Sequence, residues 1–302
     1  MSAKGNQIVK DNMVRYIDHM AKVLPDDITE ALCRLRNDET DESALSVYDN
    51  MFRNMELASQ LGRPLCQDTG IVQFWIRCGA KFPAINEVEQ SLVEAVIDAT
   101  KETPLRPNCV ETFDEINTGT NVGTGAPTIW WDILPDRDDC EVYVYLAGGG
   151  SSLPGKSEVL MPGEGYEAIV PFVMDRAVEM GINACPPLLV GIGIGNSVET
   201  AALNSKKALM RDAGSENDNP KAAQLEKLLE EGLNSVGIGP QGFGGSNSVM
   251  GVNVVSSVRH PATLAVAVNF GCWCHRRGLI AFDKDLNCKT KTHSGFAKSK
   301  EK

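Results

Sequence analysis

The chain has 302 residues, of which 42% are hydrophobic and 23% are charged, and its formal net charge is -11. These values are typical of a globular protein with a substantial core, and this length suits one large domain or two moderate ones. The negative charge argues against nucleic acid or an anionic membrane as a partner, since both attract basic surfaces, but a few arginines in a pocket still allow an anionic substrate.

The amino terminus and the cysteines indicate the compartment. Residues 1–14 mix lysine, asparagine, glutamine and aspartate, and they lack the apolar run of a secretory signal. Apolar runs also fall short of the roughly 20 residues that cross a bilayer. We therefore expect a cytoplasmic protein whose nine cysteines are thiols or metal ligands rather than a disulfide framework.

The first hundred residues are predicted to be largely helical. Apolar residues recur at spacings of three and four over residues 45–61, Asp41 is the expected N-cap, and a glycine and a proline end the pattern. A further amphipathic stretch covers residues 88–97, and Asn86 with Glu89 is expected to cap it.

Strands and helices alternate in the rest of the chain. Strands are expected at residues 72–76, 128–134, 141–146, 188–194, 249–255 and 264–270. Helices are expected at residues 165–180, 198–209 and 220–236, the last with Asn219 as its cap. A helical amino-terminal part followed by alternating strands and helices predicts an α/β fold with mixed α/β layers. The basic residues 289–302 are expected to be a flexible tail.

Three of the nine cysteines stand at the ends of expected elements. Cys66 follows a helix stop, Cys185 lies between a helix and a strand, and Cys272 follows a strand. Scaffolds often hold catalytic groups in such loops, and three thiolates on a 4Fe-4S cluster leave one iron open for a substrate. By position alone, three unrelated loop thiols are an alternative. A second alternative is a zinc site built from Cys272, Cys274, His275 and His293, whose spacing lacks the usual zinc patterns.

The glycine-rich segments raise the question of nucleotide binding. Residues 150–157 match the phosphate-loop pattern G-x-x-x-x-G-K-[ST]. That motif must open a helix, and Pro162 with Gly163 leaves no room for one, so a nucleotide-binding protein is only a remote alternative. We interpret residues 148–150 as backbone that approaches an anionic ligand, and the glycines of residues 191–195 as strand-to-helix turning.

Six segments carry a resemblance to a known family: residues 63–70, 103–119 (TPLRPNCVETFDEINTG), 147–166 (AGGGSSLPGKSEVLMPGEGY), 183–200, 237–250 and 259–278. From about residue 25 to about residue 283, the chain resembles the amino-terminal part of the class I, iron-sulfur-dependent fumarase and tartrate dehydratase family. The resemblance implies that family's α-subunit fold and a hydro-lyase catalytic domain over residues 1–288.

The resemblance also implies a role for each candidate residue. It implies that Cys66, Cys185 and Cys272 hold a 4Fe-4S cluster whose fourth iron, without a cysteine ligand, acts as a Lewis acid on the substrate hydroxyl. It makes Asp68 the acid–base residue for the departing water. The residues it implies for substrate binding are Gln67, Arg106, Gly149, Gly150 and His260, with the Arg106 guanidinium on a carboxylate.

Substrate and partner follow from the same resemblance. Residues 154–157 and 271–278 are more similar to the tartrate enzyme than to two-subunit fumarases, so we expect dehydration of L(+)-tartrate to oxaloacetate. Fumarate/malate or mesaconate hydration is the alternative. Single-chain family members carry a second domain with a threonine base, and this chain ends before it. A separate β subunit is therefore expected to complete the site, in an α2β2 assembly.

Overall fold

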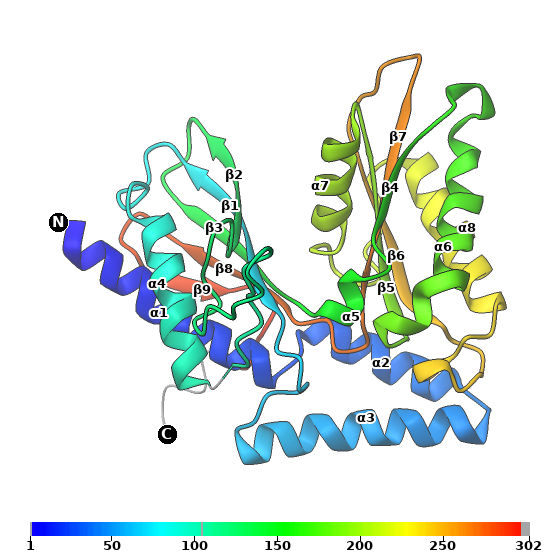
Figure 1. Cartoon of the computed structure of the whole chain (residues 1–302), viewed down its shortest axis with the longest axis horizontal. Coiled ribbons are helices and arrows are strands. Elements are labelled where there is room, and N and C mark those ends of the chain that lie inside the picture. Colours follow the sequence, from blue (N-terminus) through cyan, green and yellow to red (C-terminus); the bar gives the residue numbers. More distant parts are fainter. Residues whose placement is uncertain (1, 104, 297–302) are drawn as a thin grey trace. The chain divides into compact units, whose positions relative to one another are not determined.

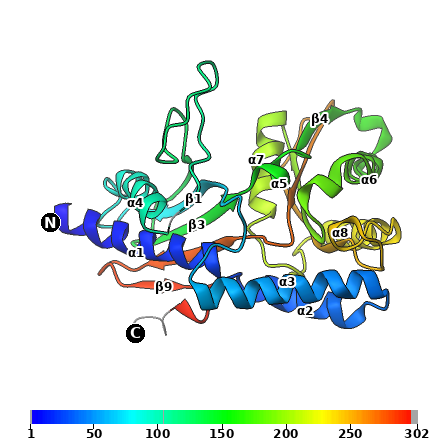
Figure 2. The same cartoon turned by 60° about the horizontal axis from the view of Figure 1, so that its bottom comes forward.

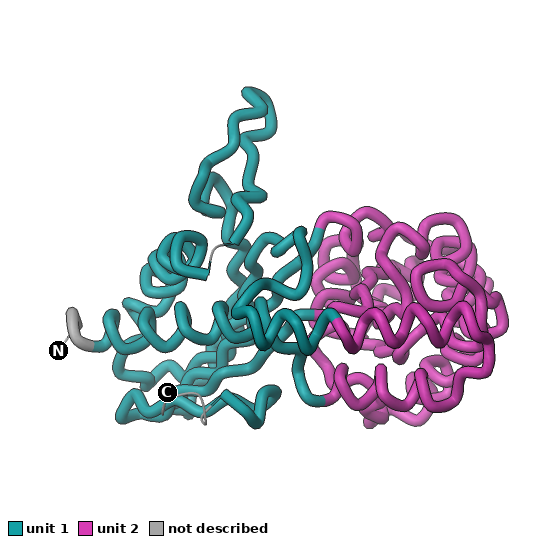
Figure 3. The backbone as a smooth tube through the Cα atoms, turned by 90° about the horizontal axis from the view of Figure 1, so that it is seen from below, with its two compact units in different colours: residues 1–26, 54–148, 276–302 teal, residues 27–53, 149–275 magenta. Residues whose placement is uncertain are grey.

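The computed structural model describes residues 2–103 and 105–296. The chain forms two compact units: unit 1 comprises residues 1–26, 54–148 and 276–302, and unit 2 comprises residues 27–53 and 149–275 (Figure 3). Length alone allowed one large domain or two moderate ones. The chain folds as two units, and each of them is built around its own sheet.

Unit 1 contains a five-stranded sheet with the strand order β2-β1-β3-β8-β9 (Figure 1). The strands are β1 (Ile71–Gly79), β2 (Thr128–Leu134), β3 (Cys140–Ala147), β8 (Arg277–Phe282) and β9 (Cys288–Thr290). β1 and β2 are parallel, and the other neighbouring strands are antiparallel. The helices of this unit include α1 (Ser2–Lys22) and α4 (Val88–Glu102).

The core of unit 1 lies between its sheet and these two helices. Along β1 every second residue is buried, as expected for a strand with one face on the core. Phe74 of β1, Ile17 of α1 and Leu92 of α4 belong to one cluster of fully buried side chains. The buried side chains that alternate along β1 therefore pack in a single apolar layer with the apolar faces of α1 and α4.

Unit 2 contains a four-stranded sheet with the strand order β4-β7-β5-β6, in which β5 and β6 are parallel and β7 is antiparallel to both β4 and β5. The strands are β4 (Lys156–Leu160), β5 (Leu188–Gly195), β6 (Val249–Ser256) and β7 (Leu264–Gly271). The α-helices are α2 (Asp26–Asp38), α3 (Glu42–Leu61), which continues into unit 1, α5 (Gly149–Ser152), α6 (Ile169–Met180), α7 (Val198–Ala208) and α8 (Pro220–Ser235). The 3-10 turns are η1 (Pro162–Glu164), η2 (Tyr166–Ala168), η3 (Gly181–Ala184) and η4 (Pro240–Gly242).

Helices cover both faces of the unit 2 sheet (Figure 1). On one face, Ile192 of β5 packs in a cluster with Phe172 of α6 and Leu229 of α8. On the other face α7 comes so close to β5 that a Cβ on Gly193 would lie 1.9 Å from the Ala201 carbonyl oxygen. Gly191 and Gly193 therefore serve close packing of a helix on a strand, and their interpretation as strand-to-helix turning was wrong. Gly195 ends β5, where the chain turns toward α7.

The expected elements are confirmed, with differences at their ends. Asp41 caps α3, since its Oδ1 accepts a hydrogen bond from Ala44 N at 2.9 Å, and Asn219 caps α8. The cap expected for α4 is wrong, because the N-cap position is Glu87 rather than Asn86. Three strands, β4, β8 and β9, were not expected.

The carboxyl-terminal segment also differs from the expectation of a flexible tail. β9 ends at Thr290, His293 is 1% exposed, and the Phe296 ring centroid lies 5.2 Å from that of Tyr16. Residues 289–296 are thus part of the packed fold of unit 1, because their rings complete the core beside α1. Residues 297–302 lie outside the described residues.

Two further features concern the phosphate-loop pattern and the length and polarity of the helices. The helix that would have to follow the phosphate-loop pattern is replaced by a strand, since α5 ends at Ser152 and β4 begins at Lys156. Over residues 2–103 and 105–296, every helix is too short or too polar to cross a membrane.

Candidate active site

The loop that carries Cys66 follows α3 in unit 1. Leu65 anchors this loop on both sides: its N–H donates to Ala21 O at 2.8 Å, and its carbonyl accepts from Asn54 Nδ2 at 2.8 Å. The next residue, Cys66, is half-buried, and Gln67 is exposed. The anchored backbone therefore presents the Cys66 thiol at the margin of the core.

Asp68 forms a tight turn in the same loop. Its Oδ1 accepts a hydrogen bond from Gly70 N at 2.9 Å and another from Asn108 Nδ2 at 3.1 Å. Gly70 has a φ of +81°, and a Cβ there would lie 2.7 Å from the Leu146 carbonyl carbon, so this position requires glycine. The turn fixes the direction of the Asp68 carboxylate, which is a requirement for a proton-transfer group.

Arg106 lies on a second loop, which is joined to the first by hydrogen bonds. Arg106 N donates to Thr69 Oγ1 at 2.9 Å, and Asn121 Nδ2 donates to Arg106 O at 3.1 Å. Asn121 is 1% exposed, and its Oδ1 accepts from Asn108 N at 2.6 Å. Because the backbone of Arg106 is held while the residue is exposed, its guanidinium can reach a ligand near Asp68.

A buried guanidinium supports the Asp68 turn from a third segment of unit 1. Arg276 Nη2 donates to Asp68 O at 2.8 Å, and Leu146 N donates to Arg276 O at 3.0 Å. Arg276 is 2% exposed. A guanidinium keeps its positive charge at any physiological pH, so a permanent positive charge lies beside this turn and favours an anion there.

Cys185 lies in unit 2, directly after the 3-10 turn η3, and has a left-handed backbone with a φ of 57°. Two neighbouring segments hold its loop. Trp273 N donates to Cys185 O at 3.0 Å, and Gln241 donates to Pro186 O from its backbone N at 3.0 Å and its Nε2 at 3.1 Å. The structure therefore joins the loops of Cys185 and Cys272. Cys185 is exposed and Cys272 is half-buried.

The glycine turn of residues 149–150 packs against the Cys185 loop. A Cβ on Gly150 would lie 2.8 Å from the Asn183 carbonyl oxygen, so a glycine is needed for this approach. Gly149 and Gly150 are both exposed at the start of α5. Their backbone is therefore accessible beside the loop that carries Cys185, and the interpretation of these glycines as backbone near a ligand stays a prediction.

His260 lies away from this group. It sits in the connection between β6 and β7, whereas Cys272 directly follows the far end of β7. The eight residues of β7 separate the two by roughly 20 Å or more at about 3.3 Å per residue. His260 is exposed, and its Nδ1 accepts from Ala262 N at 3.1 Å, so the neutral ring carries its proton on Nε2. His260 therefore does not belong with Cys185 and Cys272 of its own chain.

The three cysteines that the sequence predicts as cluster ligands lie in loops of both units. Cys66 belongs to unit 1, and Cys185 and Cys272 belong to unit 2; all three lie outside the core, in loops held by hydrogen bonds. Within the part of the chain that the structure describes, no group of three or more His, Cys, Asp or Glu residues is arranged to hold a metal ion. The zinc alternative gains no support, because His275 Nε2 lies 2.9 Å from Leu209 O. Convergence of the three cysteines stays a prediction.

Several supporting residues were missed from the sequence. Asn108, Asn121 and Arg276 join the loops of unit 1, and Gln241 holds the Cys185 loop. Residues 103–119 and 237–250 were recognised as similar to a family, but only Arg106 among them was given a role. The sequence signal that could have indicated Gln241 is the glycine-rich segment around it. In the structure Gln241 itself has a left-handed φ of 55°.

Comparison with known proteins identifies the family. A family model described as Fumarate hydratase (Fumerase) matches residues 10–281. L(+)-tartrate dehydratase subunit alpha of Escherichia coli K12 is 52% identical over 274 residues, which cover 91% of this chain and 90% of the relative; the Shigella sonnei protein of that name gives the same values. A putative L(+)-tartrate dehydratase subunit alpha of Methanocaldococcus jannaschii is 34% identical over 90% of this chain and 96% of the relative. The chain belongs to the fumarate hydratase (Fumerase) family of hydro-lyases.

Proposed function

We propose that this chain is the α subunit of a cytoplasmic hydro-lyase that removes water from L(+)-tartrate to give oxaloacetate. The observation that carries the proposal is the 52% identity, over 91% of the chain, to L(+)-tartrate dehydratase subunit alpha. Fumarate/malate and mesaconate hydration would use the same groups, and the experiment below separates these substrates.

The three cysteines Cys66, Cys185 and Cys272 are the proposed ligands of a 4Fe-4S cluster. Support comes from the backbone bond between Trp273 and Cys185, which joins two of the loops. A cluster with one iron that lacks a cysteine ligand supplies a Lewis acid for the leaving hydroxyl.

Binding of the dicarboxylate is assigned to Arg106, Gln67 and the backbone of residues 149–150. A guanidinium offers two parallel N–H groups to a carboxylate, and Arg106 is exposed with its backbone held at both N and O. The positive charge of Arg276 beside the Asp68 turn adds attraction for a dianion. These groups fix the orientation of the substrate before any bond breaks.

Asp68 is the proposed acid–base residue. Loss of water from tartrate removes a hydroxyl from one carbon and a proton from its neighbour, and the resulting enol becomes oxaloacetate by moving its hydroxyl proton to carbon. Asp68 would protonate the departing hydroxyl, and the hydrogen bonds from Gly70 N and Asn108 Nδ2 hold its carboxylate in one orientation. The base for the carbon-bound proton is assigned to the β subunit.

His260 is proposed to act on a substrate bound at another copy of the chain. It lies at the far end of β7 from Cys272 of its own chain, so it can bind the same substrate as the cysteines only across a subunit contact. The neutral ring, with its proton on Nε2, can donate a hydrogen bond to a substrate oxygen. The α2β2 assembly that we propose contains the required second copy.

The experiment compares the purified α chain, alone and with its β subunit, under anaerobic conditions after cluster reconstitution. We expect L(+)-tartrate to be turned over faster than D-tartrate, malate or mesaconate, and only by the pair. Replacement of Cys185 by Ser should lower iron and sulfide content, whereas Cys33→Ser, which changes an exposed thiol on α2, should not. Full activity of the α chain alone, or wild-type iron content in Cys185→Ser, would contradict the proposal.

A further inference from the structure

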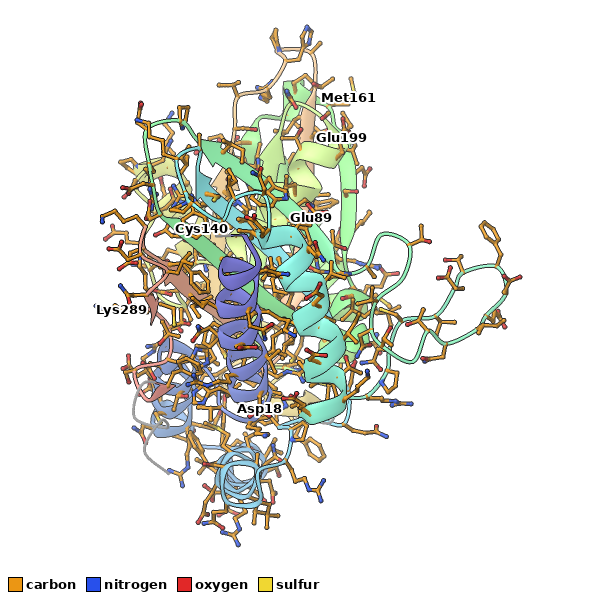
Figure 4. All side chains as sticks on the ribbon, turned by 90° about the vertical axis from the view of Figure 1, so that its left-hand side faces the viewer. Asp18, Glu89, Cys140, Met161, Glu199 and Lys289 are labelled. Carbon is orange, nitrogen blue, oxygen red and sulfur yellow. The ribbon has the colours of Figure 1, made fainter. Side chains whose placement is uncertain are left out.

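A small hairpin projects from unit 1 between α4 and β2, and its residues 109–118 are called the 109–118 hairpin below (Figure 2). Its two arms are bonded to each other: Val110 pairs with Asn117, Thr118 N donates to Cys109 O at 2.9 Å, and Glu111 N donates to Ile116 O at 2.9 Å. The view of Figure 4 shows the same segment standing clear of α4 and the sheet. The hairpin therefore has a defined shape although it projects into solvent.

The base of the hairpin is tied to the candidate site. Cys109 is 5% exposed, and the neighbouring Asn108 donates to both Asp68 Oδ1 and Gly70 O at 3.1 Å. Asn117 Nδ2 donates to Pro107 O at 2.9 Å, directly after Arg106. The hairpin and the loops of Arg106 and Asp68 thus form one hydrogen-bonded structure, and the tip is seven residues from Arg106.

The hairpin exposes three large apolar side chains. Phe113 is 98% exposed, Ile116 64% and Val110 52%. A large aromatic side chain in water forgoes the stabilisation that burial gives, and aromatic residues are enriched at protein–protein interfaces relative to the rest of the surface. Because the hairpin is already bonded into shape, docking it would cost little conformational entropy.

Acidic residues surround these apolar side chains. Glu111, Asp114 and Glu115 are all exposed on the hairpin. Two copies of this tip would repel each other, and the whole chain carries a net charge of -11, so a second copy of the chain is a poor partner for it. A partner with an apolar socket and a basic rim matches the tip in both shape and charge.

We propose that the 109–118 hairpin is the docking element for the β subunit, with Phe113 inserted in an apolar socket whose rim is basic. This inference rests on the proposed function, since relatives of this chain are named as alpha subunits and the active site is assigned to both subunits. Docking at this hairpin brings the β subunit to the loops of Arg106 and Asp68, which the hairpin base holds.

The test measures the affinity of the purified α chain for its separately expressed β subunit by anaerobic calorimetry. Phe113→Ser should weaken binding by about 30-fold or more, the effect of losing an aromatic anchor. Phe243→Ser is the matched control, because Phe243 is a 64% exposed phenylalanine of unit 2, and it should leave the affinity unchanged. The double variant Asp114→Lys, Glu115→Lys should also weaken binding, by a factor that shrinks as salt is added.

Four outcomes separate this inference from the proposed function. Wild-type affinity of Phe113→Ser for the β subunit would overturn the docking role. Loss of α self-association in that variant, with β binding intact, would assign the tip to a second copy and overturn it as well. Weak β binding by Phe113→Ser, with wild-type iron and sulfide content and turnover restored by excess β subunit, would support it. If the wild-type pair turned over no tartrate but Phe113→Ser still bound β weakly, only the proposed function would fail.

Discussion

The two units hold their candidate residues by different means. In unit 1, side chains join the loops: Asn108 bonds Asp68, Asn121 bonds Arg106, and the Arg276 guanidinium bonds the Asp68 carbonyl. In unit 2, backbone atoms and glycines do most of this work, since Trp273 N bonds Cys185 O and Gly150 packs on a carbonyl oxygen. The difference bears on how each region should respond to substitution.

Side-chain hydrogen bonds can be removed one at a time, and each loss lowers the free energy of unfolding by about 1 kcal/mol. A methyl group added at a glycine where a helix contacts a strand has no space, so the backbone of the helix or the strand must move away. We therefore expect graded effects when the side-chain bonds of unit 1 are removed and abrupt ones when the glycine contacts of unit 2 are filled. The predictions below test that contrast, beginning with the largest effect.

The largest effect is expected for Gly193→Ala in β5. The added Cβ would lie 1.9 Å from Ala201 O and 2.3 Å from Ser205 N, so α7 would have to leave the sheet. We expect the free energy of unfolding to fall by about 3 kcal/mol or more, measured by urea unfolding with far-ultraviolet circular dichroism. Gly163→Ala is the control, since a Cβ there meets nothing within 4 Å. Equal stability of the two variants would refute the close packing of α7 on β5.

The next effect is a loss of stability of unit 1 in acid. Burial lowers the pKa of His293 to about 3, and the neighbouring His19 adds to this depression. The groups that face His293 are Tyr16, His19, Asp26, Arg277 and Thr292. In the unfolded chain a histidine has a pKa of about 6.5, so below that pH the unfolded state binds more protons than the folded state. The stabilisation is complete above about pH 6.5 and is lost as pH falls toward 3.

For one such histidine the free energy of unfolding should fall by about 1.4 kcal/mol per pH unit below pH 6.5. Tryptophan fluorescence in urea at pH 7, 6 and 5 measures this, because Trp75, Trp130 and Trp131 all lie in unit 1. The variant His293→Phe keeps a ring in the core but removes the titrating group, so its stability should depend less on pH. An unchanged slope would show that another group titrates instead.

The sequence predicted the elements well because their signals are local. The helical period of α3, the alternation along β1 and the caps at Asp41 and Asn219 are all set by neighbours within a few residues. Two of the three strands that were missed, β8 and β9, are short and flanked by charged residues. They are stabilised by pairing with β3 and with each other, which is information from distant parts of the chain.

The candidate site was predictable in part for the same reason. Loop position singled out Cys185 and Cys272, and the structure joins their loops through Trp273 N. The support of Asp68 by Arg276 depends on residues more than two hundred positions apart, and no local pattern announces it. The role of His260 could also be predicted only in part. Its resemblance to a family residue suggests substrate binding, but it does not say which copy of the chain holds that substrate.

The smallest predicted effect tests the side-chain bonds of unit 1. Asn108→Ala removes the donor to Asp68 Oδ1 and to Gly70 O but creates no clash, so the fold should persist. Loss of the bond to the Asp68 carboxylate should lower kcat/KM of the α–β pair for L(+)-tartrate by about fivefold, or about 1 kcal/mol. The control Asn50→Ala removes an exposed amide that bonds Ser46 O on α3, and it should have no effect on kcat/KM.

If Asn108→Ala matched the wild type in kcat and KM, the turn at Asp68 would be held well enough by Gly70 N and Arg276 alone. If the variant instead unfolded, the side-chain bonds of unit 1 would act as cooperatively as the glycine contacts of unit 2, and the contrast between the units would be wrong.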